Sequence, residues 1–300
     1  MKRQYKNLSE YVNTIVKESK TARKKVITSG FDILDKIIGS FRQGELVVIA
    51  SRPSVGKTAL ALSMAVNMAF GEESIPIGYF TMEMDGISLM NRVVANVGRM
   101  NLMDLRKDSK DDSLIKQIAD VSEMMFAESD NMYICDESSL QFSDIYLQAI
   151  QMVYEKGVKA IFIDYLGIIG YGWNDSVCMP RHEWISLAAK ELKQLARELD
   201  IPIICLCQIN REGGRERPPM LADLRDAGTL EHEADIILLL DDPSSRIESY
   251  GIEKKEVVCH DNESEGKIRT ISVAKHRNGI TGTINLRFFP EFARFENNHL

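Results

Sequence analysis

Apolar residues along this chain form two kinds of pattern: short continuous runs, and longer stretches in which they recur every three or four positions. Runs of about four to eight apolar residues are typical of buried strands, and the longer spacing is typical of amphipathic helices. We expect strands at 45–51, 77–82, 132–135, 158–164, 201–207, 235–240, 268–275 and 283–289. We expect helices at 59–70, 87–97, 113–128, 142–155 and 182–198, with a short one opening at 29–38.

The alternation of strands and helices predicts the fold class. Helical connections between successive strands cross over in the right-handed sense and place the strands parallel, with helices on both faces of the sheet. The last two strands are separated only by residues 276–282, which indicates a hairpin. We therefore predict an α/β protein with a doubly wound, mostly parallel sheet and a C-terminal β-hairpin.

The first 25 residues have a different pattern from the rest. Leu8, Val12 and Val16 lie at helical spacing, and a basic stretch at 21–25 follows them. Nothing around them offers a core of their own. We predict a linker helix and a basic connector over residues 1–25, and one domain over residues 26–300.

Composition narrows the class of protein. No apolar stretch approaches the roughly 20 residues of a membrane span, and no signal peptide opens the chain, so we expect a soluble, cytoplasmic protein without membrane contact. The five cysteines include no Cys-x-x-Cys pair, which argues against a zinc site or a disulfide framework; Cys205 and Cys207 share one face of a predicted strand and are expected in the core. A net charge of −7 argues against nucleic-acid binding by the whole surface but allows a local basic channel.

The strand at 45–51 leads into Arg52-Pro-Ser-Val-Gly-Lys-Thr58 and then into a helix, the order typical of a phosphate-binding P-loop. Lys57 would reach the β- and γ-phosphates, and the Thr58 hydroxyl would bind Mg²⁺. Ser51 replaces the usual first glycine, so the turn must close without it. A surface loop with a chance Gly-Lys-Thr is the alternative, which the flanking strand and helix disfavour. The predicted nucleotide contacts are Ser54, Val55, Gly56, Lys57, Thr58 and Ala59.

Two acidic residues end predicted strands. Asp164 ends the strand at 158–164, and ligands of open α/β sheets bind beyond the carboxyl ends of the strands, so Asp164 is expected beside the P-loop and its Mg²⁺. Glu83 follows the strand at 77–82, where it could deprotonate the attacking water. Glu83 could instead be a capping acid of the helix that starts near Asp85.

These motifs and several distal ones resemble the C-terminal, RecA-like ATPase domain of the hexameric replicative DNA helicases of the DnaB family, over about 27–297. The resemblance rests on segments 51–58, 80–84, 163–166, 207–211, 223–228 and 274–279. It implies that Glu83 activates water, that Asp164 supports Mg²⁺ and that Gln208 senses the γ-phosphate. It also implies that Lys275 and Arg277 reach the neighbouring subunit's nucleotide, whereas the residues alone favour a solvated hairpin tip.

Candidate DNA contacts lie in loops. The resemblance places Arg225, Asp226 and Gly228 on a pore loop that holds the DNA backbone, with Asp226 where the family often has Glu. The arginine- and glycine-rich stretch 211–219 could track phosphates or be a plain solvated loop. Residues 170–180 depart from the family pattern, and their two aromatic residues could stack on bases or cover apolar surface.

We therefore expect an enzyme that uses ATP and Mg²⁺ to move along single-stranded DNA during replication. The implied partners are further copies of the chain in a ring, expected to be a hexamer, with a primase and a helicase loader. A RecA-like recombinase, a clock-type ATPase, or a DNA-binding or helicase-loading module that uses ATP as a switch are the alternatives. Family members carry an N-terminal helical domain before the linker helix, so we expect a truncated or a naturally short helicase.

Overall fold

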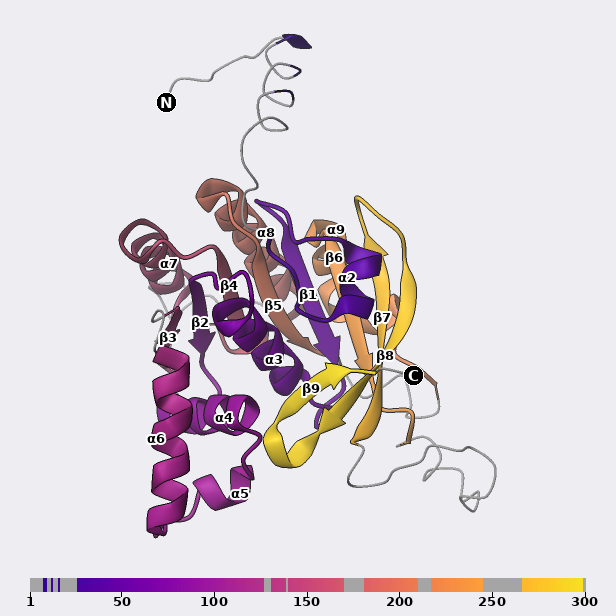
Figure 1. Ribbon diagram of the computed structural model, residues 1–300. Coiled ribbons are helices and arrows are strands. Elements are labelled where there is room, and N and C mark those ends of the chain that lie inside the picture. The colour runs from indigo at the N-terminus through magenta and orange to yellow at the C-terminus, as the bar shows by residue number, and fades with distance from the viewer. Residues whose placement is uncertain are drawn as a thin grey trace.

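The computed structural model describes residues 8, 9, 12, 16, 26–126, 131–138, 140–169, 181–209, 217–244 and 266–298. In this part of the chain nine strands form one sheet, in the order β3-β2-β4-β5-β1-β6-β7-β8-β9 (Figure 1). The strands are β1 (Leu46–Ser51), β2 (Ile77–Thr81), β3 (Met132–Cys135), β4 (Ala160–Asp164), β5 (Ile203–Gln208), β6 (Ile236–Asp241), β7 (Lys267–His276), β8 (Gly282–Phe289) and β9 (Arg294–Asn297).

The helices lie mostly in the connections between the parallel strands. They are α2 (Asp32–Ile38), α3 (Lys57–Phe70), α4 (Gly86–Gly98), α5 (Leu102–Leu105), α6 (Asp112–Phe126), α7 (Phe142–Lys156), α8 (Arg181–Leu199) and α9 (Gly228–Glu233), with 3₁₀ turns η1 (Leu166–Ile168), η3 (Leu221–Ala227) and η5 (Pro290–Phe292). Among the described residues, none of these helices combines the length and the apolar character that crossing a membrane requires.

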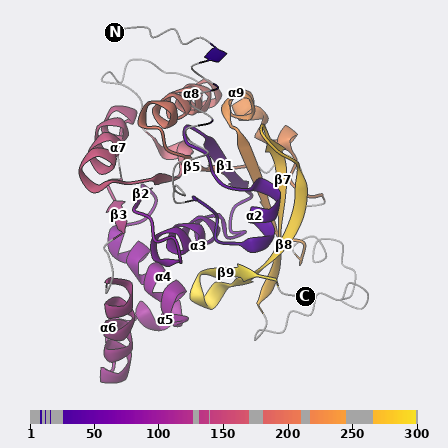
Figure 2. The same cartoon turned by 45° about the horizontal axis from the view of Figure 1, so that its top comes forward.

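Strand β1 occupies the centre of the sheet, parallel to β5 on one side and to β6 on the other. All six of its residues are buried, because helices cover both faces of the sheet. Val47 and Ile49 pack with α2, α3 and α4, whereas Leu46 and Val48 pack with α7, α8 and α9. Figure 2 shows these two helical layers on opposite sides of the strands. The predicted doubly wound, mostly parallel sheet is confirmed.

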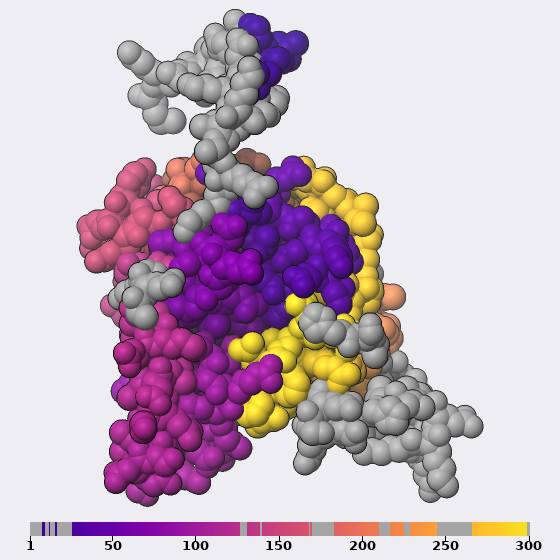
Figure 3. All heavy atoms as spheres, viewed as in Figure 1, coloured from indigo at the N-terminus to yellow at the C-terminus, as the bar shows by residue number. Residues whose placement is uncertain are grey.

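The C-terminal part of the sheet is antiparallel. Strands β7 and β8 form the predicted hairpin, β7 also pairs with β6, and β9 returns along β8. Strand β9 was not predicted from the sequence, because its four residues Arg-Phe-Glu-Asn alternate only one apolar side chain with charged neighbours. Figure 3 shows the yellow C-terminal strands directly against the indigo and purple residues of the first part of the chain.

Most of the expected elements are present with ends shifted by one or two residues. The short elements α5, α9 and η3 were not predicted, because elements of four to seven residues give too little periodicity to recognise. Cys205 and Cys207 are buried in β5, as predicted. Most of the predicted linker, the loop at 211–216 and the stretch 170–180 lie outside the described residues.

Candidate nucleotide-binding site

The turn between β1 and α3 has the backbone conformation of a tight anion-binding loop. Ser54 and Gly56 both have positive φ, 66° and 112° respectively. A Cβ at position 56 would lie 3.3 Å from the Phe295 ring of β9, so both the backbone angle and the close approach require glycine. Lys57 is the first residue of α3, which places the helix N-terminus and its amide groups at this turn.

This turn forms the floor of a cavity of about 380 Å³. Residues far apart in the sequence meet there: the turn itself, the residues after β2, one residue of α4, the end of β5, and the end of β8 with the η5 turn that follows it. The lining residues are Ser51, Arg52, Pro53, Ser54, Gly56, Lys57, Thr58, Ala59, Glu83, Met84, Arg92, Gln208, Phe288, Pro290 and Ala293. Of the predicted nucleotide contacts, only Val55 does not line the cavity, and it is 9% exposed.

Asp164 lies at the buried end of β4, opposite Thr81 of β2, and is 1% exposed. Its Oδ2 accepts a hydrogen bond from the Tyr79 hydroxyl at 3.4 Å, while its Oδ1 is buried without a partner among the described residues. Burial raises the pKa of Asp164, and the nearby Thr58 hydroxyl and Lys57 ammonium partly offset the rise. An unsatisfied carboxylate oxygen beside a hydroxyl and a P-loop fits a hard divalent cation.

The Lys57 ammonium stands over the Tyr165 ring, 4.7 Å from its centroid. Tyr165 directly follows Asp164, so the P-loop cation and the acid at the end of β4 share one wall of the site. A cation over an aromatic face is attracted by the ring quadrupole, which holds the ammonium in place without consuming its hydrogen-bond donors. The Lys57 donors therefore stay available for phosphate oxygens.

Glu83 lies just beyond β2 with its side chain exposed at the cavity. The helix-capping alternative does not describe it, because Asp85 is the N-cap of α4 and accepts a hydrogen bond from the Ser88 amide at 2.8 Å. The Glu83 side chain therefore does not cap α4, and it lies at the cavity. Gln208, the last residue of β5, pairs in register with Ser51 and lines the same cavity.

Arg92 of α4 is a cavity residue that the sequence analysis missed. Its Nε is buried and has no partner among the described residues. Burial and the nearby Arg106 lower its pKa, whereas the charges of Tyr79, Asp164 and Glu83 raise it. A signal was present in the sequence: Arg92 lies three residues after the buried Leu89 and four before the buried Asn96, so it shares their side of α4.

Lys275 and Arg277 do not line this cavity. Lys275 pairs with Ile237 at the start of β6, which is the opposite end of the sheet from the P-loop. Its Nζ donates to the carbonyls of Glu231, His232 and Ala234, at and just beyond the end of α9. Burial and the neighbouring Arg277 lower the pKa of Lys275. Figure 1 shows the tip of the β7–β8 hairpin beside α9.

The Arg277 guanidinium binds the same region. Its Nη2 donates to the His232 carbonyl and its Nη1 lies 3.4 Å from Asp235 Oδ1. Asp235 is itself buried, paired with Lys193 of α8 and bonded to the Leu46 amide of β1. Arg277 is therefore held by α9, through the His232 carbonyl, and by Asp235, which is itself bonded to α8 and β1. These contacts give its side chain a defined position although 43% of it is exposed.

The predicted DNA contacts fall on η3 and the start of α9, and the structure describes the backbone but not the side chains of Arg225, Asp226 and Gly228. The start of η3 is fixed to the P-loop. Arg52 donates to the Arg217 carbonyl at 3.0 Å, and Arg217 forms an ion pair with Asp223 through two hydrogen bonds. This pairing lowers the pKa of Asp223.

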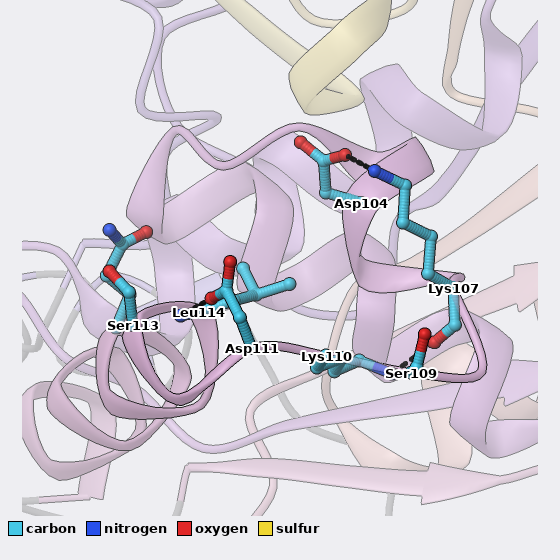
Figure 4. A pocket seen from close by; sticks show the side chains of 8 residues that line it. Asp104, Lys107, Ser109, Lys110, Asp111, Ser113 and Leu114 are labelled. Atoms are coloured by element: carbon cyan, nitrogen blue, oxygen red, sulfur yellow. Dashed lines mark hydrogen bonds and ion pairs between the residues drawn. The ribbon is translucent and has the colours of Figure 1, made fainter.

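A second hollow, of about 600 Å³, lies between α5 and α6 (Figure 4). All of its lining residues come from the single stretch 104–117, and Asp104 and Lys107 of this stretch form an ion pair at 2.6 Å. Lys110 also donates to the Lys107 carbonyl, and Asp111 accepts from the Leu114 amide, so several of its polar groups already have partners within this stretch. We therefore assign the nucleotide to the smaller cavity, where distant elements converge.

Comparison with known proteins agrees with this geometry. The family model "DnaB-like helicase C terminal domain" matches residues 26–297. The replicative DNA helicase DnaB of Treponema pallidum is 35% identical over 294 residues, covering 97% of this chain and 60% of the relative. The replicative DNA helicase DnaC of Bacillus subtilis is 34% identical over 276 residues, covering 90% of this chain and 56% of the relative. The chain thus spans little more than half the length of these curated relatives.

Two solved structures have the same fold. One, described as an ATPase domain, superposes with a TM-score of 0.82 at 28% identity, covering 99% of this chain and all of that one. A DnaB-like replicative helicase, described together with its interactions with primase, gives a TM-score of 0.79 at 30% identity, covering 98% of this chain and 69% of that one. The chain belongs to the family of DnaB-like helicase C-terminal domains.

Proposed function

We propose that this chain is the ATP-hydrolysing motor of a replicative DNA helicase, acting between copies arranged in a ring, expected to be a hexamer. The observation that carries the proposal is the division of the catalytic groups between two ends of one sheet. The P-loop, Glu83 and Gln208 converge on one cavity, whereas Lys275 and Arg277 lie at the opposite end. Each chain then contributes two different halves to two different sites.

The P-loop end binds the nucleotide. Backbone amides of the turn and of the α3 N-terminus would hold the β-phosphate, and Lys57 would reach toward the γ-phosphate. Thr58 and the unpartnered Oδ1 of Asp164 would hold Mg²⁺, which when bound neutralises phosphate charge. The Tyr79 hydroxyl donates to the other carboxylate oxygen of Asp164, which leaves Oδ1 as the oxygen that would be available to a metal ion.

Glu83 is the candidate general base. Its carboxylate is exposed at the cavity, where it can accept a proton from a water that attacks the γ-phosphate. Gln208 stands beside Ser51 at the end of β5 and can hydrogen-bond a phosphoryl oxygen from the β5 side. The neutral Gln208 amide would hydrogen-bond the γ-phosphate when it is present and lose this partner after hydrolysis, without adding charge to the site.

Lys275 and Arg277 would stabilise the transferring phosphoryl group of a neighbouring copy. Lys275 lies six positions along β7 from Arg269, which is roughly 20 Å in a strand, and Arg269 contacts the P-loop of the same chain. That distance exceeds the reach of a lysine side chain. The exposed apolar residues Leu8, Val12 and Val16, from 45% to 81% exposed, also suit contact with another copy.

Single-stranded DNA would contact η3 and the start of α9 through Arg225, Asp226 and Gly228. Contacts of this kind hold the sugar-phosphate backbone and carry no sequence information. Arg52 of the P-loop contacts Arg217, and Arg217 pairs with Asp223 of η3. These contacts would let a change at the nucleotide alter the position of η3. A primase and a helicase loader are further candidate partners; one structural neighbour is described with its primase interactions.

The test is DNA-stimulated ATP hydrolysis together with unwinding of a forked DNA duplex. We expect ATP turnover that single-stranded DNA increases and that rises steeply with protein concentration, because active sites form only between copies. Lys57→Ala serves as the inactive control. Hydrolysis at a rate independent of both DNA and protein concentration would contradict the proposal.

A further inference from the structure

Arg269 of β7 is a buried cation directly behind the P-loop. Its side chain is 6% exposed, and its Nε donates to the Val55 carbonyl at 3.2 Å. Its Nη1 donates to Asp242 Oδ1 at 2.9 Å and to the carbonyl of the neighbouring Ile268 at 3.0 Å. Asp242 follows the end of β6, so the guanidinium joins three segments: the P-loop, β6 and β7.

The contact with Val55 constrains the peptide that follows it. A trans peptide is planar, with its C=O and N–H pointing in opposite directions. When the Val55 carbonyl points at Arg269, the Gly56 amide of the same peptide points away from Arg269, and Gly56 itself lines the cavity. Gly56 has φ 112°, and because glycine has no side chain, no side-chain contact of its own holds this backbone conformation.

Arg269 also supports the aromatic wall of the cavity. Its guanidinium carbon lies 5.6 Å from the centroid of the Phe288 ring, and Phe288 stacks on Phe295 at 4.6 Å. Gly56 packs against both rings, since a Cβ there would meet Phe295 at 3.3 Å and Phe288 at 3.5 Å. One arginine thus fixes the carbonyl on one side of Gly56 and the surface against which Gly56 rests.

We propose that Arg269 is a positioning residue of the nucleotide site, which orients the 55–56 peptide so that the Gly56 amide donates to the β-phosphate. The proposal rests on the proposed nucleotide-binding function of the cavity, but it needs neither a ring nor DNA. A guanidinium suits this role because its planar donors hold the Val55 carbonyl and the Asp242 carboxylate at fixed angles, which a lysine ammonium does not. Asp242 offsets the buried charge.

The test compares the affinities of the full chain for ADP and for AMP with Mg²⁺, by equilibrium titration. Only ADP carries the phosphate that the Gly56 amide would bind, so the ratio of the two affinities isolates the P-loop from the rest of the site. In Arg269→Met we expect ADP affinity to fall about tenfold or more while AMP affinity stays at the parent value. Arg287→Met, which removes an arginine from the adjacent strand β8, should keep the parent ratio.

Two further variants separate positioning from general stability. Arg269→Lys keeps the charge and should give an intermediate ratio, because one ammonium cannot hold both acceptors in the same geometry. Asp242→Asn keeps the Val55 contact and should change the ratio less than Arg269→Met. If thermal melting shows that Arg269→Met is unfolded, Arg269→Lys decides: a reduced ratio supports the proposal and the parent ratio overturns it.

The failures can be told apart. A parent chain that binds ADP no more tightly than AMP would overturn the nucleotide assignment of the cavity, and the role of Arg269 with it. A parent that prefers ADP, together with a folded Arg269→Met variant that keeps the same preference, would overturn the Arg269 proposal alone.

Discussion

The charged groups at the two ends of the sheet differ in whether they have hydrogen-bond partners within the chain. At the P-loop end, Asp164 Oδ1 is buried without a partner among the described residues, and Lys57 rests on an aromatic ring. At the other end, Lys275 and Arg277 donate to backbone carbonyls of α9 and the segment after it. The first end is prepared for a ligand, whereas the second is satisfied by its own chain.

This difference suggests how the work is divided. A group that must bind metal or phosphate benefits from having its partner missing, because ligand binding then removes a desolvation penalty already present in the folded chain. If Lys275 and Arg277 act on a neighbouring copy, as we propose, their side chains need a fixed position, which their contacts with α9 and Asp235 supply. Substitutions at the two ends should therefore fail in different ways.

The largest effect is expected at the hairpin end. Arg277→Ala should lower the DNA-stimulated rate of ATP hydrolysis by about 10³-fold or more, because a cation that stabilises the phosphoryl transition state contributes this much in related chemistry. ATP binding should change little. The matched control is Lys267→Ala, which removes an exposed cation from the other end of β7. A full rate in Arg277→Ala would show that the hairpin plays no part in catalysis.

At the P-loop end, Glu83→Gln should lower turnover by about 10²- to 10⁴-fold, the range typical of a lost general base. Nucleotide affinity should be retained, since the amide keeps the shape of the side chain. Glu73→Gln, an exposed site just after α3, controls for the loss of one negative charge. Single-turnover hydrolysis and nucleotide titration measure the two quantities; hydrolysis at the parental rate would remove Glu83 from the mechanism.

A smaller effect is expected on DNA. Arg225→Ala should weaken binding of single-stranded DNA about tenfold, equally for unrelated sequences, and reduce the slope of log affinity against log salt by about one. Basal ATP hydrolysis should be maintained. Lys116→Ala on α6 removes the same charge elsewhere. Fluorescence anisotropy at several salt concentrations is the measurement, and an unchanged slope would exclude a phosphate contact.

The smallest effect concerns pH. Burial raises the pKa of Asp164, and the Tyr79 hydroxyl offsets part of this rise because it hydrogen-bonds the charged form of the carboxylate. Tyr79→Phe removes the lowering contribution, so the pKa should rise further. The acid limb of the pH–rate profile should then move to higher pH by up to about one unit. Tyr133→Phe on β3 should leave the profile in place, and a shift to lower pH in Tyr79→Phe would contradict the assigned contact.

The parallel half of the sheet and the P-loop end of the site could be predicted from the sequence. Continuous apolar runs mark strands buried on both faces, and the carboxyl ends of such strands meet at one edge. Asp164 and Glu83 were expected there because each ends or follows a strand, Lys57 because it belongs to the P-loop motif, and Gln208 because of the family resemblance.

The remaining features depend on tertiary contacts that the sequence does not reveal. Strand β9 is short and charged, and it forms only because β8 offers it an edge. Arg269 lies in an ordinary strand pattern, and its contact with Val55 joins residues 214 positions apart in the sequence. The spacing of Arg92 from Leu89 and Asn96 indicates that it lies on the buried side of α4. The cavity that it lines forms only when α4 packs beside the P-loop.

The most direct test of a site shared between copies is to mix two inactive chains. Arg277→Ala and Lys57→Ala, mixed in equal amounts, should regain part of the DNA-stimulated ATP hydrolysis, because some interfaces then join an intact P-loop to an intact hairpin. Glu83→Gln mixed with Lys57→Ala should regain nothing, since both changes damage the same half of the site. Recovery in the first mixture alone is the predicted result. No recovery in either mixture, with all three chains folded and assembled, would show that Arg277 does not act on the nucleotide of a neighbouring copy.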